Sequence, residues 1–180
     1  MRHAFVLCCL LSTPVAAQPT ITPVALYGPV NTVMPPAIAA RALAAHNRER
    51  GKYGEAPLVW DEALARGALD WAQELARTGK FDHAPAARRK RAGENLFMGT
   101  AGAFSIDAMI GQFIAEREDF QPGTFPYVTR DGNWHNVAHY TQIVWRGTRR
   151  VGCAIARARR DDVLVCRYWP AGNIFGQRVP

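Results

Sequence analysis

Two histidines four residues apart have the spacing in this chain that most directly suggests metal chemistry. His135 and His139 stand in the segment His-Asn-Val-Ala-His, which has the outline of the zinc-binding HExxH motif. In that motif both histidines lie on one long helix, and the glutamate between them is the general base. Asn136 replaces that glutamate and carries no carboxylate, and the segment is expected just ahead of a strand. The pattern therefore excludes a zinc protease of this type and predicts that His135 is a surface or structural histidine.

No residue of the chain stands out as a catalytic nucleophile. The sequence has neither a Gly-x-Ser-x-Gly elbow nor a glycine-rich phosphate loop, and Ser105 is expected to cap a helix. The cysteines that would remain after export are accounted for by one disulfide, as argued below. These features favour a binding protein over an enzyme.

Three short segments, in a fixed order, carry a family resemblance. They are Gly93–Leu96 (GENL), His139–Trp145 (HYTQIVW) and Gly152–Ala154 (GCA). Together they resemble the CAP superfamily, which comprises the cysteine-rich secretory, antigen 5 and pathogenesis-related 1 proteins. The resemblance covers roughly residues 46–177. It implies a CAP/PR-1-like fold of the α+β class, a three-layer αβα sandwich with a central, mostly antiparallel sheet.

The resemblance also implies a ligand-binding cleft lined by two histidines and two glutamates, which correspond here to His83, Glu94, Glu116 and His139. Glu94 and His139 lie within the matching segments themselves. Glu116 lies at the edge of an apolar helical stripe, where a carboxylate needs a partner. His83 precedes Glu94 by eleven positions, more than is usual in the family, because segment 85–91 looks like a basic insertion. Loop length costs little free energy, so His83 is still expected to reach the cleft.

Some members of the family hold a divalent metal in this cleft, so the resemblance implies His83 and His139 as metal ligands. A neutral imidazole binds Zn²⁺ through one ring nitrogen, while a carboxylate orients the other nitrogen. Zn²⁺ is therefore the expected cofactor. Two alternatives stay open. The four side chains form only a stabilising hydrogen-bond network, or the protein is a zinc-dependent hydrolase with Glu94 or Glu116 as its base.

The N-terminal segment has the parts of a secretory signal peptide, which we predict at residues 1–17. A positive charge precedes the apolar run 4–11, and the small residues 15–17 offer a cleavage site. The apolar run is too short for a permanent membrane span, so no transmembrane segment is expected. Cleavage would remove Cys8 and Cys9, and two remaining cysteines in an exported chain suggest one disulfide. The sequence thus predicts a secreted, extracellular or periplasmic protein.

The charge balance is basic, with a formal net charge of +7. Arginine and lysine cluster at residues 88–91, 149–150 and 157–160. Such clusters could bind anionic lipid or another anionic envelope component, or they could simply form a solvated surface. Nucleic acid is not an expected partner, because no nucleic-acid-binding motif accompanies the charge.

Two segments are predicted to lack regular structure. Residues 18–36 contain five prolines and little periodicity, which indicates an extended lead-in outside the core. The CAP domain is then expected to occupy residues 37–180. Within it, segment 81–104, which contains GENL, is predicted to be an irregular loop.

Three helices are predicted from apolar periodicity and from end signals. The first spans residues 37–50 and contains His46, which is expected to be structural rather than a ligand. The second begins after Asp61, a good N-cap, and ends at Gly79. The third follows Ser105 and presents an apolar stripe.

The C-terminal third is predicted to contain a β-hairpin formed by residues 151–156 and 163–168. If its turn centres on Arg159 and Arg160, Cys153 lies directly opposite Cys166. Directly opposed antiparallel residues are close enough for a disulfide. The hairpin is largely apolar on both faces and therefore needs a covering layer on each, which independently favours a helix–sheet–helix sandwich.

These features predict a secreted CAP-domain protein whose His/Glu cleft binds a divalent cation. A lipid or another apolar ligand is a further expectation from the family. The alternatives are the zinc-dependent hydrolase and a cell-envelope interaction module that acts through the basic surface.

Overall fold

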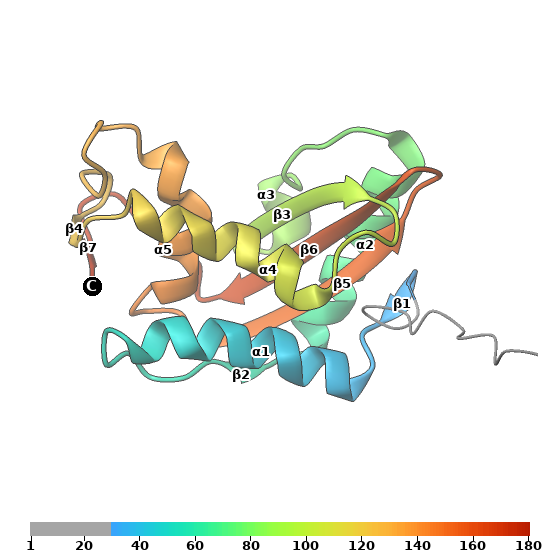
Figure 1. The fold of residues 1–180 in the computed structure, drawn as a ribbon, viewed down its shortest axis with the longest axis horizontal. Helices are drawn as coiled ribbons and strands as arrows, with labels where there is room; N and C mark the ends of the chain where they lie inside the picture. The colour runs from blue at the N-terminus through green and yellow to red at the C-terminus, as the bar shows by residue number, and fades with distance from the viewer. Residues whose placement is uncertain (1–29) are drawn as a thin grey trace, which may run out of the picture.

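The computed structural model describes residues 30–180, and the predicted signal peptide and most of the lead-in lie outside the described residues. The helices are α1 (Pro36–Gly51), α2 (Glu62–Thr78), α3 (Ala86–Arg89), α4 (Ile106–Ala115) and α5 (Ala138–Val144), with 3-10 turns η1 (Glu116–Glu118) and η2 (Trp134–Val137). The strands are β1 (Thr32–Val33), β2 (Val59–Trp60), β3 (Gly93–Thr100), β4 (Gly123–Thr124), β5 (Arg150–Arg157), β6 (Asp161–Trp169) and β7 (Arg178–Val179) (Figure 1). None of the helices within residues 30–180 combines the length and apolar character that crossing a bilayer requires.

The main sheet is built around the β5–β6 hairpin. Its strand order is β1-β5-β6-β3, and β2 adds a short parallel pairing to β5 while the other pairings are antiparallel. Cys153 pairs with Cys166 in the hairpin, so the predicted register is confirmed. Strands β4 and β7 form a separate two-stranded sheet.

Helices cover both faces of the sheet, so the predicted three-layer αβα sandwich is confirmed. Figure 1 shows α2 on one side and α1, α4 and α5 on the other. The α2 side buries alternate hairpin residues, Ala154, Ala156, Val163 and Val165, against Ala68, Ala72 and Leu75. The other face contributes Val151, Ile155 and Leu164 to a larger core with α1, α4 and α5. Alternation along each strand therefore sends one set of side chains to each layer.

The helix ends follow the predicted capping residues. The Asp61 carboxylate accepts the Leu64 N–H at 2.9 Å, and Gly79 ends α2 in the left-handed region at φ 70°. The Ser105 hydroxyl accepts the Ala108 N–H at 3.2 Å at the start of α4. These contacts satisfy backbone groups that a helix end leaves unpaired.

Three sequence-based expectations are wrong in detail. The end of the lead-in is not outside the core, because β1 pairs with β5 and Met34 is buried. The GENL segment is not an irregular loop, because it opens strand β3, which pairs with β6 over its whole length. His139 does not precede a strand, since it lies in the short helix α5. Strand pairing overrides the weak local preferences of the first two segments, and contacts at both helix ends do so for the third.

Helix α2 packs tightly against strand β5 at Gly152, the glycine of the GCA segment. A Cβ at this position would lie 2.3 Å from the Ala65 backbone nitrogen and 2.4 Å from the Asp61 carbonyl oxygen. Only glycine permits this contact, so the GCA motif sets the spacing between helix and sheet.

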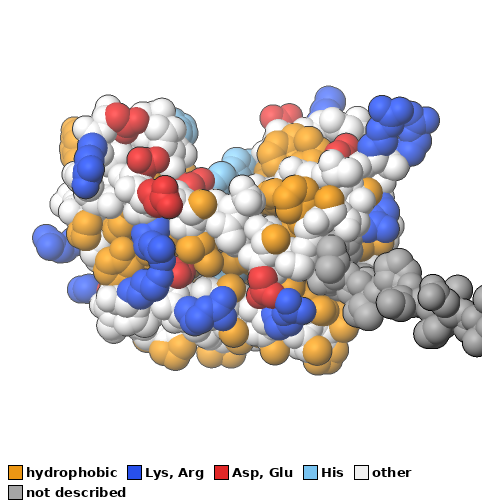
Figure 2. Space-filling view, viewed as in Figure 1, with side chains coloured by type: hydrophobic (Ala, Val, Ile, Leu, Met, Phe, Trp, Pro, Cys, Tyr) orange, Lys and Arg blue, Asp and Glu red, His pale blue; other side chains and the backbone are white. Residues whose placement is uncertain are grey.

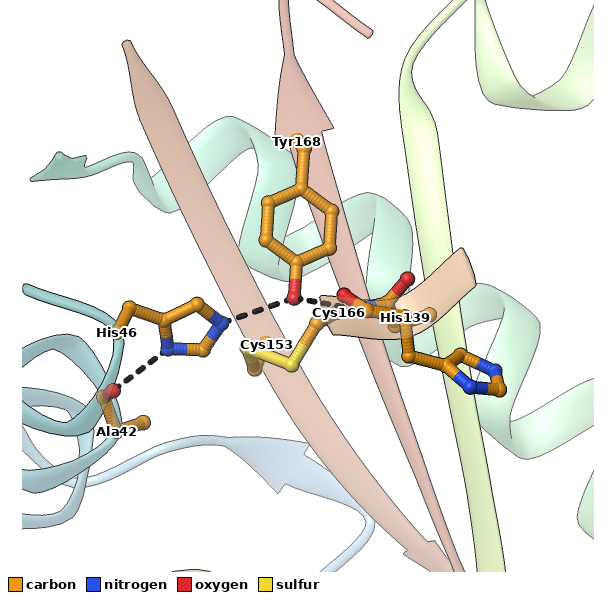
Figure 3. The surroundings of a disulfide bond; sticks show 7 residues. Ala42, His46, His139, Cys153, Cys166 and Tyr168 are labelled. Atoms are coloured by element: carbon orange, nitrogen blue, oxygen red, sulfur yellow. Dashed lines mark hydrogen bonds between the residues drawn. A yellow bond between two sulfur atoms is a disulfide. The ribbon is translucent and has the colours of Figure 1, made fainter. Parts of the chain in front are cut away.

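A buried polar network lies beside the Cys153–Cys166 disulfide (Figure 3). The Nδ1 of His46 contacts the Ala42 carbonyl at 2.7 Å, and its Nε2 contacts the Tyr168 hydroxyl at 2.9 Å. Because a carbonyl only accepts, Nδ1 carries the proton, and neutral Nε2 accepts from the tyrosine. The Asn95 amide donates to the same hydroxyl at 3.1 Å. The prediction that His46 is structural agrees with this arrangement.

Acid should weaken the fold through His46. Burial lowers the pKa of His46 from 6.5 to about 4. Between these values the unfolded chain binds a proton that the folded chain does not, so the free energy of unfolding falls as the pH falls. From about pH 6.5 to about pH 5 the loss should be about 2 kcal/mol. Urea unfolding at both pH values measures it. In His46→Gln the difference in the free energy of unfolding between the two pH values should shrink by that amount. An unchanged difference would contradict the role of His46 in this pH dependence.

The disulfide should stabilise the hairpin mainly through the unfolded state. Its cysteines are 13 residues apart, and closing such a loop contributes about 3 kcal/mol in the chain-entropy model. The double variant Cys153→Ala/Cys166→Ala should lose about that free energy of unfolding in urea titrations. Mass spectrometry of non-reduced protein should find the two cysteines linked, and free thiols in exported protein would contradict the bond.

Candidate functional site

The structure has a cavity of about 420 Å³ between β3, the η2–α5 segment and the loop after β6. Figure 2 shows the surface hollowed between two lobes, with histidine side chains (pale blue) inside the hollow. The cavity wall includes His83, Glu94 and His139, three of the four residues that the family resemblance implies. Glu116 is absent from the wall and lies behind His139 instead.

His83 and Glu94 form the first histidine–carboxylate pair. The Nδ1 of His83 lies 2.9 Å from Glu94 Oε1, which also accepts the Ala84 N–H at 2.9 Å. The Glu94 side chain is fully buried, whereas 53% of the His83 side chain is exposed. The carboxylate therefore holds the imidazole from behind and leaves Nε2 at the accessible edge. The structure thus brings His83 to the cleft despite the longer spacing.

His139 and Glu116 form the second pair. The Nδ1 of His139 lies 2.5 Å from Glu116 Oε1. The other carboxylate oxygen accepts the backbone N–H groups of His139 and Tyr140, at 2.9 and 3.0 Å. Glu116 thus caps the start of α5 and orients the imidazole at the same time. The ring of His139 also stacks on Phe113, with centroids 5.0 Å apart.

The GENL and HYTQ segments are in direct contact. The Asn95 amide donates to the His139 carbonyl at 3.0 Å. At Gly93 a Cβ would lie 2.1 Å from the side-chain oxygen of Gln142, so this glycine makes room for the glutamine. That oxygen accepts the Gly172 N–H at 2.9 Å, and the amide nitrogen donates to the Thr148 hydroxyl at 3.1 Å. The two motifs therefore build one wall of the cavity together.

The far end of α5 is held by the buried guanidinium of Arg50. Its Nη1 donates to the carbonyls of Ile143 and Trp145 at 2.9 and 2.8 Å, and its Nη2 donates to that of Thr148 at 3.2 Å. Its Nε donates to the Ala56 carbonyl at 2.7 Å. Burial lowers the pKa of Arg50 to about 10, so the group stays charged at neutral pH. Helix α5 is thus fixed at both ends.

His135 lies in the cavity wall as well, a position that sequence reasoning missed. It is exposed, as expected for a surface histidine, and stacks on Trp134 with ring centroids 3.7 Å apart. Its spacing of four residues from His139 was the sequence signal that could have placed it there. That spacing spans the junction of η2 and α5 rather than one long helix.

The described wall residues are mostly polar. Among them are imidazoles, amides and one arginine, but no serine, threonine, cysteine or lysine. Each of His83 and His139 has its Nδ1 on a carboxylate, the arrangement typical of metal-binding histidines. Within residues 30–180, however, no set of three or more His, Cys, Asp and Glu side chains is grouped closely enough to hold a metal ion. A cation bound there would take further ligands from water or from the bound molecule.

Comparison with known proteins identifies close sequence relatives. The profile of the cysteine-rich secretory protein family, CAP, matches residues 43–168. The chain is 34% identical to the pathogenesis-related protein PR-1 type of Sambucus nigra over 74% of this chain and 77% of that protein. It is 35% identical to pathogenesis-related leaf protein 4 of Solanum lycopersicum over 76% of this chain and 79% of that protein.

Solved structures show the same fold at lower sequence identity. The crystal structure of NaASP2 with Zn²⁺ has a TM-score of 0.65 and 24% identity, covering 77% of this chain and 82% of that one. The structure of BmVAL-1 has a TM-score of 0.64 and 22% identity, covering 81% of this chain and 82% of that one. The folds therefore correspond over most of both chains.

The dual role of Glu116 predicts an effect on stability. Glu116→Gln keeps one accepting oxygen and replaces the other with an NH₂ group, so the backbone N–H groups at the start of α5 and the Nδ1–H of His139 can no longer all be accepted. The free energy of unfolding should fall by about 1–3 kcal/mol in urea titrations. Glu118→Gln is the matched control, because Glu118 lies in the same turn and is exposed. Equal effects of the two substitutions would refute the capping role.

Proposed function

The chain belongs to the cysteine-rich secretory protein (CAP) family, and on that premise we propose that it is an exported binding protein whose cleft holds a divalent cation between His83 and His139. The observation that carries the proposal is the pair of imidazoles in one cavity wall, each held at Nδ1 by a glutamate. Such a carboxylate fixes the ring and makes its other nitrogen a better ligand.

The chemistry of the donor set fits Zn²⁺. Imidazole nitrogen is a preferred zinc ligand, and two protein ligands leave coordination positions open for water or for a ligand atom. When bound, the ion would supply a positive charge that attracts an anionic or carbonyl group of a ligand. One structural neighbour is described with Zn²⁺, which makes zinc the first cation to test.

The contacts of the two glutamates favour binding over the hydrolase alternative. Glu94 is bound by His83, the Ala84 N–H and Arg167, with Arg167 Nε 3.4 Å from Oε2. Glu116 is bound by His139 and two backbone N–H groups. A general base needs a carboxylate oxygen within reach of the water that it activates. Both glutamates instead serve to hold histidines.

Export is supported by the family and by the disulfide. The Cys153–Cys166 bond joins the central strands of the sheet, and such bonds persist in oxidising compartments. An apolar ligand in the same cleft is part of the proposal because Trp134, Ala138 and Ala171 contribute apolar surface to the wall.

Zinc titration tests the cation site. Calorimetry at about pH 7.5 should show about one site, with much weaker binding near pH 5, because protons compete with the metal for the imidazole nitrogens. His83→Ala and His139→Ala should each remove most of the affinity. Glu94→Gln should weaken it about 10–100-fold, the usual cost of losing the group that orients a metal-binding histidine.

His135→Ala is the matched control for these variants. The residue is an exposed histidine in the same wall, but it stacks on Trp134 and has no carboxylate behind it among the described residues. Its loss should leave the affinity nearly intact. No zinc uptake by the wild type at about pH 7.5, where imidazole is largely neutral, would show that the two pairs are only a stabilising network.

A further inference from the structure

A second pocket, which adjoins the His/Glu cleft at Arg89, has walls from α2, α3 and the ends of β5 and β6. Its volume is about 450 Å³, within the range of small-ligand sites. The wall contains six cationic side chains, Arg66, Arg88, Arg89, Lys90, Arg150 and Arg167, and two carboxylates. We call it the arginine pocket. The excess of positive charge favours an anionic occupant.

The two carboxylates do little to neutralise this charge. Asp61 is occupied with capping α2, through the Leu64 N–H at 2.9 Å, and with Arg150 at 2.7 Å. Asp70 is exposed on the next turns of α2. Arg150 thus pairs with Asp61 in the wall and Arg167 with Glu94 outside it. The other four cations of the wall form no ion pair with a carboxylate of the described residues.

Arg167 is a buried part of the pocket wall, and its neighbours fix its position. Only 8% of its side chain is exposed. Its Nε faces Glu94 and its Nη1 donates to the Arg88 carbonyl at 3.2 Å. A Cβ at Gly67 would lie 2.9 Å from Nη1, so the glycine on α2 makes room for the guanidinium. The position of this charge is set by the fold rather than by a mobile surface side chain.

The basic insertion 85–91 completes the pocket. It folds into α3, and Arg89 anchors it through Nε, which donates to the Ala84 carbonyl at 2.8 Å. Arg88 lies over the ring of Trp71, 5.4 Å from the centroid. The insertion therefore adds three cations, Arg88, Arg89 and Lys90, to the wall of this cavity.

We propose that the arginine pocket binds an acidic saccharide, a sugar ring that carries carboxylate or sulfate groups. Arginine binds such planar or multi-oxygen anions through paired N–H groups. Trp169 and Leu64 add apolar surface to the wall, against which the carbon face of a sugar ring can pack. A single inorganic ion would leave most of the volume and the indole surface unused.

Calorimetry on the whole exported protein tests the proposal. The probes are digalacturonate, a sulfated heparin disaccharide, and lactose as the neutral control. At least one acidic disaccharide should bind and lactose should not, and comparing the two acidic probes distinguishes carboxylate from sulfate. Failure of both acidic disaccharides to bind, whether or not anionic phospholipid vesicles bind, or binding of lactose with equal affinity, would overturn the proposal.

A matched pair of double variants separates the pocket from the net charge. Arg66→Gln/Lys90→Gln removes two charges from the pocket wall, and Arg159→Gln/Arg160→Gln removes two from the exposed β5–β6 turn. The first should weaken binding about tenfold or more, and the second less than about twofold, since exposed distant charges are screened. Equal weakening by both double variants would show that binding comes only from diffuse electrostatic attraction to the net charge. Thermal melting of each variant checks that it is folded, and zinc binding, which uses other residues, should be unchanged in both.

Discussion

The buried guanidinium of Arg50 is the interaction on which much of this structure depends. A charge without water is costly unless its hydrogen-bonding capacity is met. Arg50 meets it with carbonyls from the loop after α1, from the end of α5 and from the turn that leads to β5. The same bonds satisfy the last carbonyls of a helix only seven residues long. Arg50 therefore supports the end of the helix that carries His139, as Glu116 supports its start.

The two histidines of the cleft are held by the same arrangement. In each case a carboxylate that is buried or half-buried holds the imidazole at Nδ1 and also accepts a backbone N–H group. The supporting residues come from distant parts of the chain, β3 for Glu94 and the turn after α4 for Glu116. Packing of the layers therefore places both carboxylates, while the loop before α3 supplies His83 and the loop after β6 supplies one wall of the cavity.

Much of the fold follows from local signals, whereas the wall of the site does not. The caps Asp61, Gly79 and Ser105 mark helix ends because they satisfy specific backbone groups, and alternation sets the hairpin register. Helix α5 is not evident from the sequence because its residues, rich in β-branched and aromatic types, favour a strand. Contacts from distant residues, among them Glu116 at its start and Arg50 at its end, stabilise it as a helix. Strand β3 is not evident from the sequence because glycine and asparagine disfavour strands, and because its partner β6 lies far along the chain.

Glu94 has neighbours on two sides. One oxygen accepts from His83 in the cleft, and the other faces Arg167, which lines the arginine pocket. The two residues are directly opposed on β3 and β6, so the carboxylate is shared between two surfaces of the molecule. An anion bound beside Arg167 would share its positive charge and leave more of the negative charge of Glu94 for His83. Thermodynamic reciprocity then requires that a cation held by His83 favour an anion beside Arg167 by the same factor. Occupancy of the two sites would be positively cooperative without any rearrangement of the backbone.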